Sequence, residues 1–463
     1  MEWEKSNKNH LFGEYHKENR CSPESTPGFS GIFHKAVKKG NPDAIVVGFE
    51  LAGCDFAFAE RAFKAGGLQY MDVLAIHPYD WSGHIDTKKP INDCNQMKEL
   101  MRKYGEEKPI WWTEYGIGTR YTLEEQRNGF VMMYAIQECY DIADLTLQFR
   151  MQDDLRIGGL EAGWGLLWDY GDLGRENGAK PSYLGVCAMN NLIGANAEAK
   201  DVINDGTTYA FRFYNKKMEK DVVVLESEYD GEYMTLRLGS KELEAYDVYG
   251  NKLEPIVSET GIYGFSINKE PIYLVGNLDY FEKVDNEHAK ITPVCVEDSV
   301  IPGETITFSV KNRTGGKVKL VSKENDWIQL EKSNETADGV MSVTLRTSKE
   351  LTEDTYVDLL VLNEKEQVIY RGKGLIHAAK EPIDIAISTE PTAEGVDHWR
   401  ARVEITNLMR ENTLSGTLSV IAPEKVASYC KPRSLALLSP RETRTLYLNL
   451  PFQAVKNSYS LQL

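Results

Sequence analysis

Glu114 is the residue whose surroundings best suit chemistry. It lies at the C-terminal tip of the strand predicted from the aromatic run PIWWTEYG at residues 109–116, and Gly116 predicts a turn immediately afterwards. Sugar rings stack on aromatic faces, so a carboxylate flanked by Trp112 and Tyr115 suits attack on an anomeric carbon. A buried strand that ends in a solvated glutamate explains this run equally well when it is taken alone.

Three further apolar runs predict the elements that must position this carboxylate. Half-buried strands alternate apolar and polar residues. This alternation is absent from residues 44–49, 71–77 and 164–168, and also from 109–114. Unbroken apolar runs are typical of strands buried on both faces. We expect these four strands to be parallel and adjacent in chain order.

Helical patterns lie between the runs, at residues 56–65 and 91–104 and from Thr122 onward, where Glu125 completes a capping box. Alternating strands and helices predict a parallel α/β domain. Chemistry at the carboxyl ends of four strands favours a (β/α)8 TIM barrel over an open sheet.

Four short motifs in this order resemble a known group of enzymes. They are HPY at 77–79, WWTEYG at 111–116, GLLWDYG at 165–171 and KPSYLG at 180–185. Together they resemble the second half of a clan A glycoside hydrolase, with family 39 nearest and family 5 next. The resemblance covers about residues 1–198.

The resemblance implies a retaining O-glycosidase that acts by double displacement on a plant- or host-type polysaccharide or oligosaccharide. Glu114 matches the nucleophile of the seventh strand, and a second, protonated carboxyl would donate to the leaving oxygen and later activate water. Tyr79 would hydrogen-bond Glu114 and keep it ionised. This chemistry requires no metal or cofactor. The expected substrate-binding residues are His77, Tyr79, Trp81, Trp112, Tyr115 and Trp168.

The acid/base is harder to place, because the clan carries it in an Asn-Glu pair that residues 1–7 lack. Glu4 is the best candidate and Glu2 the second, and Glu14 is a weaker option. An alternative alignment places Lys5 at this position, which would abolish the usual mechanism.

If residues 1–7 hold the end of the fourth strand, the chain contains only strands 4–8 of a barrel. We therefore interpret it as N-terminally truncated. The alternative function is a non-catalytic carbohydrate-binding or scaffolding relic of a glycosidase, supported by Lys5 and the missing Asn-Glu pair. Hydrolysis and transglycosylation by the same residues remain open alternatives.

The pattern becomes β-rich after the barrel-like region. Residues 199–279 predict a small β-sandwich packed on the barrel, with a hairpin signal at Gly250-Asn251. Residues 283–379 and 380–463 resemble immunoglobulin-like β-sandwich modules, the last one cut short. For Trp327 and Trp399 we favour core packing over a sugar-binding platform.

Composition restricts the partners. A net charge of −17 and a pI near 5.1 argue against nucleic acid and anionic membrane surfaces. No apolar run is long enough to span a bilayer, and no signal peptide follows Met1. We expect the full-length protein to be secreted or at the cell surface. Seven scattered cysteines without a CxxC pair argue against a zinc site or a disulfide framework, and His77 is expected to be a hydrogen-bonding pocket residue.

Overall fold

The computed structural model describes most of the chain, and the chain divides into two compact units that are considered separately. The first unit comprises residues 1–232, 238–255 and 267–283, and the second comprises the rest. The described residues are Pro23 and 26–79, 87–118, 122–154, 163–169, 178–194, 196–323, 325–336, 339–379, 381–391, 399–410, 412–418 and 433–450.

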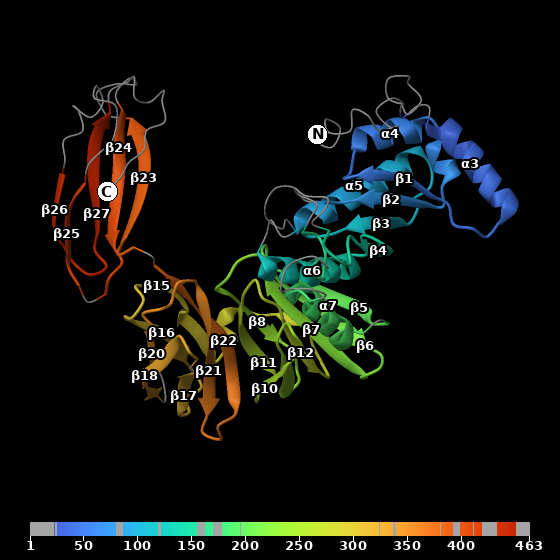
Figure 1. The fold of residues 1–463 in the computed structure, drawn as a ribbon. Helices are drawn as coiled ribbons and strands as arrows, with labels where there is room; N and C mark the ends of the chain where they lie inside the picture. Colours follow the sequence, from blue (N-terminus) through green and yellow to red (C-terminus); the bar gives the residue numbers. More distant parts are fainter. Residues whose placement is uncertain are drawn as a thin grey trace. The chain divides into compact units, whose positions relative to one another are not determined.

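The first unit contains a four-stranded parallel sheet in the order β1-β2-β3-β4 (Figure 1). Its strands follow one another in the chain, as in consecutive strand–helix units. The described chain is therefore mixed α/β with many strands. The strands are β1 (Val47–Ala52), β2 (Val73–His77), β3 (Ile110–Tyr115) and β4 (Leu145–Gln148).

Three of the four predicted strands are confirmed as parallel neighbours, namely those near 44–49, 71–77 and 109–114. The fourth prediction was wrong, because the neighbour of β3 is β4 and not residues 164–168. Strand β4 has the short sequence LTLQ, in which polar residues interrupt the apolar ones, so it carries no apolar run. Leu167 instead forms an isolated parallel bridge to Gln152.

The helices follow the predicted pattern. Thr122 Oγ1 accepts from the backbone N–H of Glu125, whose side chain accepts from the backbone N–H of Thr122, so the capping box is confirmed. The helices are α3 (Thr26–Gly40), α4 (Phe56–Lys64), the 3-10 helix η1 (Gly67–Tyr70), α5 (Lys88–Tyr104), α6 (Leu123–Cys139) and α7 (Pro181–Leu192). None of the described helices is long and apolar enough to cross a membrane.

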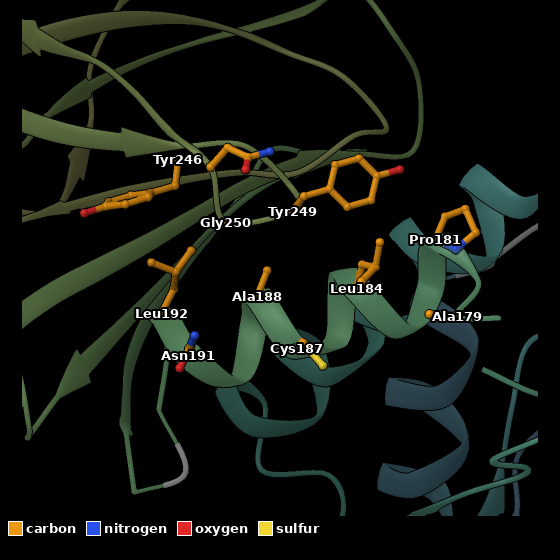
Figure 2. A pocket seen from close by; sticks show the side chains of 11 residues that line it. Ala179, Pro181, Leu184, Cys187, Ala188, Asn191, Leu192, Tyr246, Tyr249 and Gly250 are labelled. Carbon is orange, nitrogen blue, oxygen red and sulfur yellow. The ribbon is translucent and has the colours of Figure 1, made fainter. Parts of the chain in front are cut away.

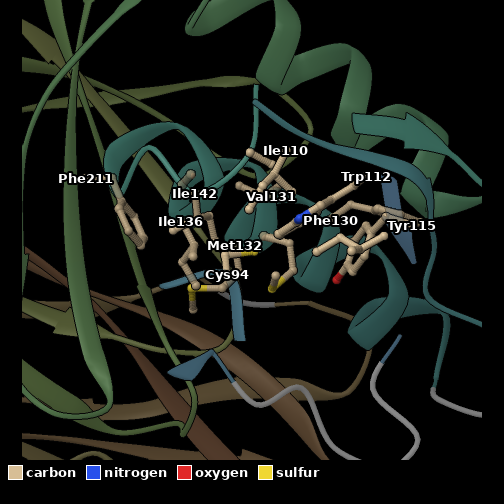
Figure 3. Packing of buried hydrophobic residues seen from close by; sticks show 14 of the residues in the cluster. Cys94, Ile110, Trp112, Tyr115, Phe130, Val131, Met132, Ile136, Ile142 and Phe211 are labelled. Carbon is tan, nitrogen blue, oxygen red and sulfur yellow. The ribbon is translucent and has the colours of Figure 1, made fainter. Parts of the chain in front are cut away.

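An antiparallel sheet completes the first unit, with β5, β6, β7, β12 and β9 as successive neighbours. Its buried side chains share one hydrophobic core with α6 and the parallel sheet, as Phe211, Val131 and Ile110 illustrate (Figure 3). The strands of this sheet are β5 (Glu198–Asn204), β6 (Thr208–Asn215), β7 (Lys220–Ser227), β9 (Glu242–Tyr246) and β12 (Ile272–Gly276), and β10 (Lys252–Val257) is the next neighbour of β9. The short strand β13 (Glu282–Lys283) belongs to a separate three-stranded sheet.

The second unit is β-rich. The sheet β14-β16-β20-β18 and the strands β17, β21 and β22 share a core that includes Phe308, Val343 and Val361. The strands β23-β24-β27 form a further sheet, and β25 pairs with β26. Trp327 is 43% exposed, so the prediction that it packs into a core was wrong, and the side chain of Trp399 lies outside the described part. The immunoglobulin-like assignment and the boundaries 1–198, 199–279, 283–379 and 380–463 stay predictions.

The elements of the second unit are β8 (Glu232–Arg237), β11 (Ile262–Ile267), the 3-10 helix η3 (Asn286–His288), β14 (Ile291–Cys295), β15 (Glu297–Val300), β16 (Thr305–Asn312), β17 (Val318–Ser322), β18 (Ile328–Ser333), β19 (Glu335–Thr336), β20 (Gly339–Thr347), β21 (Thr355–Asn363), β22 (Val368–Ala378), β23 (Ile383–Pro391), β24 (Trp399–Asn407), β25 (Leu414–Leu418), β26 (Arg433–Leu438) and β27 (Thr443–Leu450).

Candidate active site

A β-bulge near the carboxyl end of β3 sets the direction of Glu114. Trp112 pairs with Thr146 on β4, but Tyr115 pairs with Gln148, so β3 carries one extra residue between these pairs. Such an insertion reverses the alternation of side chains beyond it. Trp112 and Tyr115 therefore both face the hydrophobic core, and Thr113 and Glu114 both contact His77.

Two side chains from the end of β2 hold the Glu114 carboxylate. Tyr79 Oη donates a hydrogen bond to Glu114 Oε2 at 3.2 Å, which is the contact that the sequence predicts. His77 Nδ1 lies 3.4 Å from the same oxygen, and His77 Nε2 lies 3.0 Å from Thr113 Oγ1. Both contacts are to Oε2, and the second carboxylate oxygen, Oε1, takes part in neither.

This arrangement can fix the tautomer of His77. If the Thr113 hydroxyl donates to Nε2, the ring proton resides on Nδ1 and faces Glu114 Oε2. The side chain of His77 is 16% exposed, whereas that of Glu114 is 40% exposed. The carboxylate is thus anchored on a shielded partner and remains accessible from solvent.

An aromatic cluster adjoins Tyr79. The centre of the Tyr79 ring lies 5.0 Å from the centre of the Trp164 ring and 6.3 Å from that of the Phe149 ring, and both pairs have edge-to-face geometry. Sequence reasoning did not assign Trp164 or Phe149 to the site. The signal for Trp164 was its place at the start of the apolar run, but Phe149 follows β4, which the pattern did not reveal.

A buried ion pair supports the segment that carries Trp168. Lys180 Nζ lies 2.8 and 2.7 Å from the two carboxylate oxygens of Asp153, and Lys180 is fully buried. The backbone N–H of Gly165 donates to Asp153 at 2.7 Å, and Lys180 Nζ lies 4.9 Å from the centre of the Trp168 ring. Sequence reasoning missed this pair, although Lys180 opens the KPSYLG motif.

Two predicted substrate contacts need correction. Trp112 is fully buried and Tyr115 is 7% exposed, and both pack in the core beside α6, with 5.4 Å between their ring centres. They are core residues in this structure because the bulge separates their direction from that of Glu114. Convergence of Trp168 on Glu114 stays a prediction. The Trp168 ring lies near Lys180 Nζ, and the Trp168 backbone hydrogen-bonds to Gln152 and Gly178.

The remaining predicted site residues lie outside the described part of the chain. These are Trp81 and the acid/base candidates Glu2, Glu4 and Glu14, together with Lys5. Within the described ranges, no group of three or more His, Cys, Asp or Glu side chains is arranged to hold a metal ion.

In comparisons of sequence, no family model and no curated protein match the chain. Similar solved structures include a glycoside hydrolase family 17 β-1,3-glucanosyltransferase from Rhizomucor miehei, with 19% identity over 35% of this chain and 56% of that one, at a TM-score of 0.25. The endo-β-1,4-mannanase from Thermotoga petrophila is 10% identical over 78% of this chain and 62% of that one, at 0.29.

A third similar structure is Bacteroides uniformis β-glucuronidase 3, which is 11% identical over 77% of this chain and 47% of that one, at a TM-score of 0.27. The chain thus spans less than two thirds of each of these proteins. These identities and TM-scores assign neither a family nor an activity to it, and the family 39 resemblance stays a prediction.

Proposed function

We propose that the protein is a retaining O-glycoside hydrolase with Glu114 as its nucleophile. The observation that carries the proposal is the Glu114 carboxylate, whose Oε2 accepts a hydrogen bond from Tyr79 at the carboxyl ends of parallel strands. In parallel α/β folds this end of the sheet is where ligands bind. A carboxylate anchored by one oxygen can attack with the other.

In the proposed reaction, Glu114 Oε1 attacks the anomeric carbon and the leaving oxygen takes a proton from a second carboxyl. Water then releases the glycosyl group from Glu114 with that carboxyl as base. Retention requires the two carboxyl groups to lie about 5–5.5 Å apart. Glu4 is the first candidate for the second carboxyl, followed by Glu2 and Glu14.

The sequence resemblance supports the remaining parts of the proposal. They are a clan A barrel related to family 39, attached β-sandwich modules with an immunoglobulin-like character, and secretion or display at the cell surface. A plant- or host-type polysaccharide or oligosaccharide is the proposed substrate. His77 and Trp168 would shape the sugar pocket beside Tyr79.

A screen of aryl β-glycosides against the protein tests the proposal. Glu114→Gln should fold normally and lose nearly all turnover, because no covalent intermediate can form. Glu4→Gln should slow substrates with poor leaving groups more than activated aryl ones, since only the former need a proton. If Glu4→Gln has no effect on unactivated substrates, the acid is Glu2, Glu14 or another residue.

A carbohydrate-binding relic is the second candidate function, because one alignment places Lys5 at the acid/base position. The relic would bind oligosaccharides without cleaving any aryl β-glycoside. Turnover that depends on Glu114 would exclude it.

A further inference from the structure

A hollow of about 830 Å³ lies between α7 and the turn that joins β9 to β10 (Figure 2). None of its lining residues belongs to the cluster around Glu114. Its volume is in the range of small-molecule sites. The side chains that matter here are Leu184, Cys187 and Asn191 from α7, and Tyr246, Tyr249 and Asn251 from the hairpin.

The hairpin wall of this hollow is tightly constrained. Asp247 Oδ1 accepts the backbone N–H groups of Tyr249 at 2.9 Å and Asn251 at 2.8 Å. Gly250 has φ of 79°, and a Cβ there would lie 3.2 Å from Cβ of Ala188. The positive φ of this turn favours a glycine, and its close approach to α7 leaves little room for a Cβ.

Both tyrosines of the wall are held in place before any ligand arrives. The guanidinium carbon of Arg127 lies 4.8 Å from the centre of the Tyr249 ring, and Arg127 also donates to the Tyr249 hydroxyl. Arg127 is itself fixed by Glu270, at 2.7 Å. The Tyr246 hydroxyl donates to Glu244 at 2.9 Å. Preorganised rings lose little conformational entropy on binding.

The opposite wall is a single face of α7. Leu184, Cys187 and Asn191 recur at helical spacing, and Figure 2 shows the Leu184 and Ala188 side chains directed toward the hairpin. Leu184 is 48% exposed and Tyr249 is 39% exposed. Large apolar side chains thus remain open to solvent on both walls, beside the amides of Asn191 and Asn251.

We propose that this hollow, which forms a groove between α7 and the hairpin, binds a neutral oligosaccharide. Tyrosine rings can stack on the C–H faces of sugar rings, and asparagine amides can donate to and accept from hydroxyl groups. None of the described residues that line the groove is charged, and the net charge of −17 disfavours anionic ligands. The inference is independent of the proposed chemistry at Glu114.

Cys187 provides a reporter at the groove, because this free cysteine is an exposed residue that lines it. The experiment measures the rate of N-ethylmaleimide alkylation at Cys187 by peptide mass spectrometry, with and without cellohexaose, mannohexaose or laminarihexaose. Burial raises the pKa of the Cys139 thiol to about 12, so Cys139 should be alkylated far more slowly than Cys187 and serves as a comparison site outside the groove. The Glu114→Gln background prevents turnover of the probes.

At least one of the three sugars should slow alkylation of Cys187 several-fold and leave Cys139 unaffected. Leu184→Glu should abolish this protection by placing a charge in the groove, whereas Asn190→Glu, an exposed change on α7 outside the lining, should retain it. Tyr249→Ala gives a second test, because loss of the stacking ring should also abolish protection. Equal rates with and without all three sugars, or protection that survives Leu184→Glu, would overturn the inference. Activity at Glu114 would be unaffected by that result.

Discussion

Replacement of Lys180 by methionine should strongly destabilise the first unit. Lys180 is fully buried, and its ammonium lies within 2.8 Å of both oxygens of Asp153. Burial lowers the pKa of Lys180, and the hydrogen bond and charge of Asp153 oppose that shift. Lys180→Met removes the ammonium and leaves the carboxylate of Asp153, which is 7% exposed, without its counter-charge.

The expected loss is about 3–5 kcal/mol in the free energy of unfolding, the cost of removing one partner from a buried ion pair. The double variant Lys180→Met/Asp153→Asn should recover most of this loss, because it removes both charges. The amide oxygen introduced by Asp153→Asn can still accept the N–H of Gly165, which donates to Asp153 at 2.7 Å. Without that acceptor, a buried N–H would remain unsatisfied.

Hydrogen exchange followed by mass spectrometry is the suitable assay, because a chain with two units need not unfold in one step. Exchange in peptides from α6 and α7 as a function of denaturant gives the stability of the first unit alone. Lys103→Met is the matched control, since Lys103 pairs with Glu60 at 2.6 Å on the surface and should contribute little. A small effect of Lys180→Met, or a double variant as unstable as the single one, would refute the reasoning.

Three further outcomes follow from local geometry. Thr122→Ala should cost about 1 kcal/mol by removing the α6 cap, as exchange in α6 would report, and Thr122→Ser should not. Burial raises the pKa of Glu226 well above its usual value of 4.5, so the unfolded state loses this proton at a lower pH than the folded state does. The free energy of unfolding of the wild type should therefore fall as pH rises above 4.5, by up to about 1.4 kcal/mol per pH unit. Denaturant unfolding of Glu226→Gln at the same pH values should not show this fall. Gly116→Ala should cost at least about 1–3 kcal/mol and lower kcat/KM, because its Cβ would lie 1.9 Å from the carbonyl oxygen of Phe149, whereas Gly118→Ala, whose nearest neighbour is the Trp164 ring at 3.1 Å, should be milder.

The sequence was sufficient for elements whose signal is local. Unbroken apolar runs predicted β1, β2 and β3, and the residue types at positions 122 and 125 predicted the α6 cap. Strand β4 escaped because LTLQ is short and has no continuous apolar run. Its place in the sheet depends on tertiary pairing with β3, which periodicity does not encode.

The candidate site was predictable only in part for the same reason. The order of the HPY and WWTEYG motifs led to the contact between Tyr79 and Glu114. The bulge in β3 depends on register with β4, so the sequence did not reveal that Trp112 and Tyr115 face the core. Nor could spacing show that Lys180 and Asp153, 27 residues apart, form a buried pair.

Azide rescue tests the central claim, that Glu114 is the nucleophile, most directly. Glu114→Gly leaves a space beside Tyr79 Oη into which a small anion can enter and attack the anomeric carbon of an activated aryl β-glycoside. The account predicts that this variant is inactive alone and that added azide restores release of the aryl group, with a glycosyl azide of inverted configuration as product. Full activity of Glu114→Gly without azide would contradict it. So would an active wild type whose Glu114→Gly variant is not rescued by azide and forms no glycosyl azide.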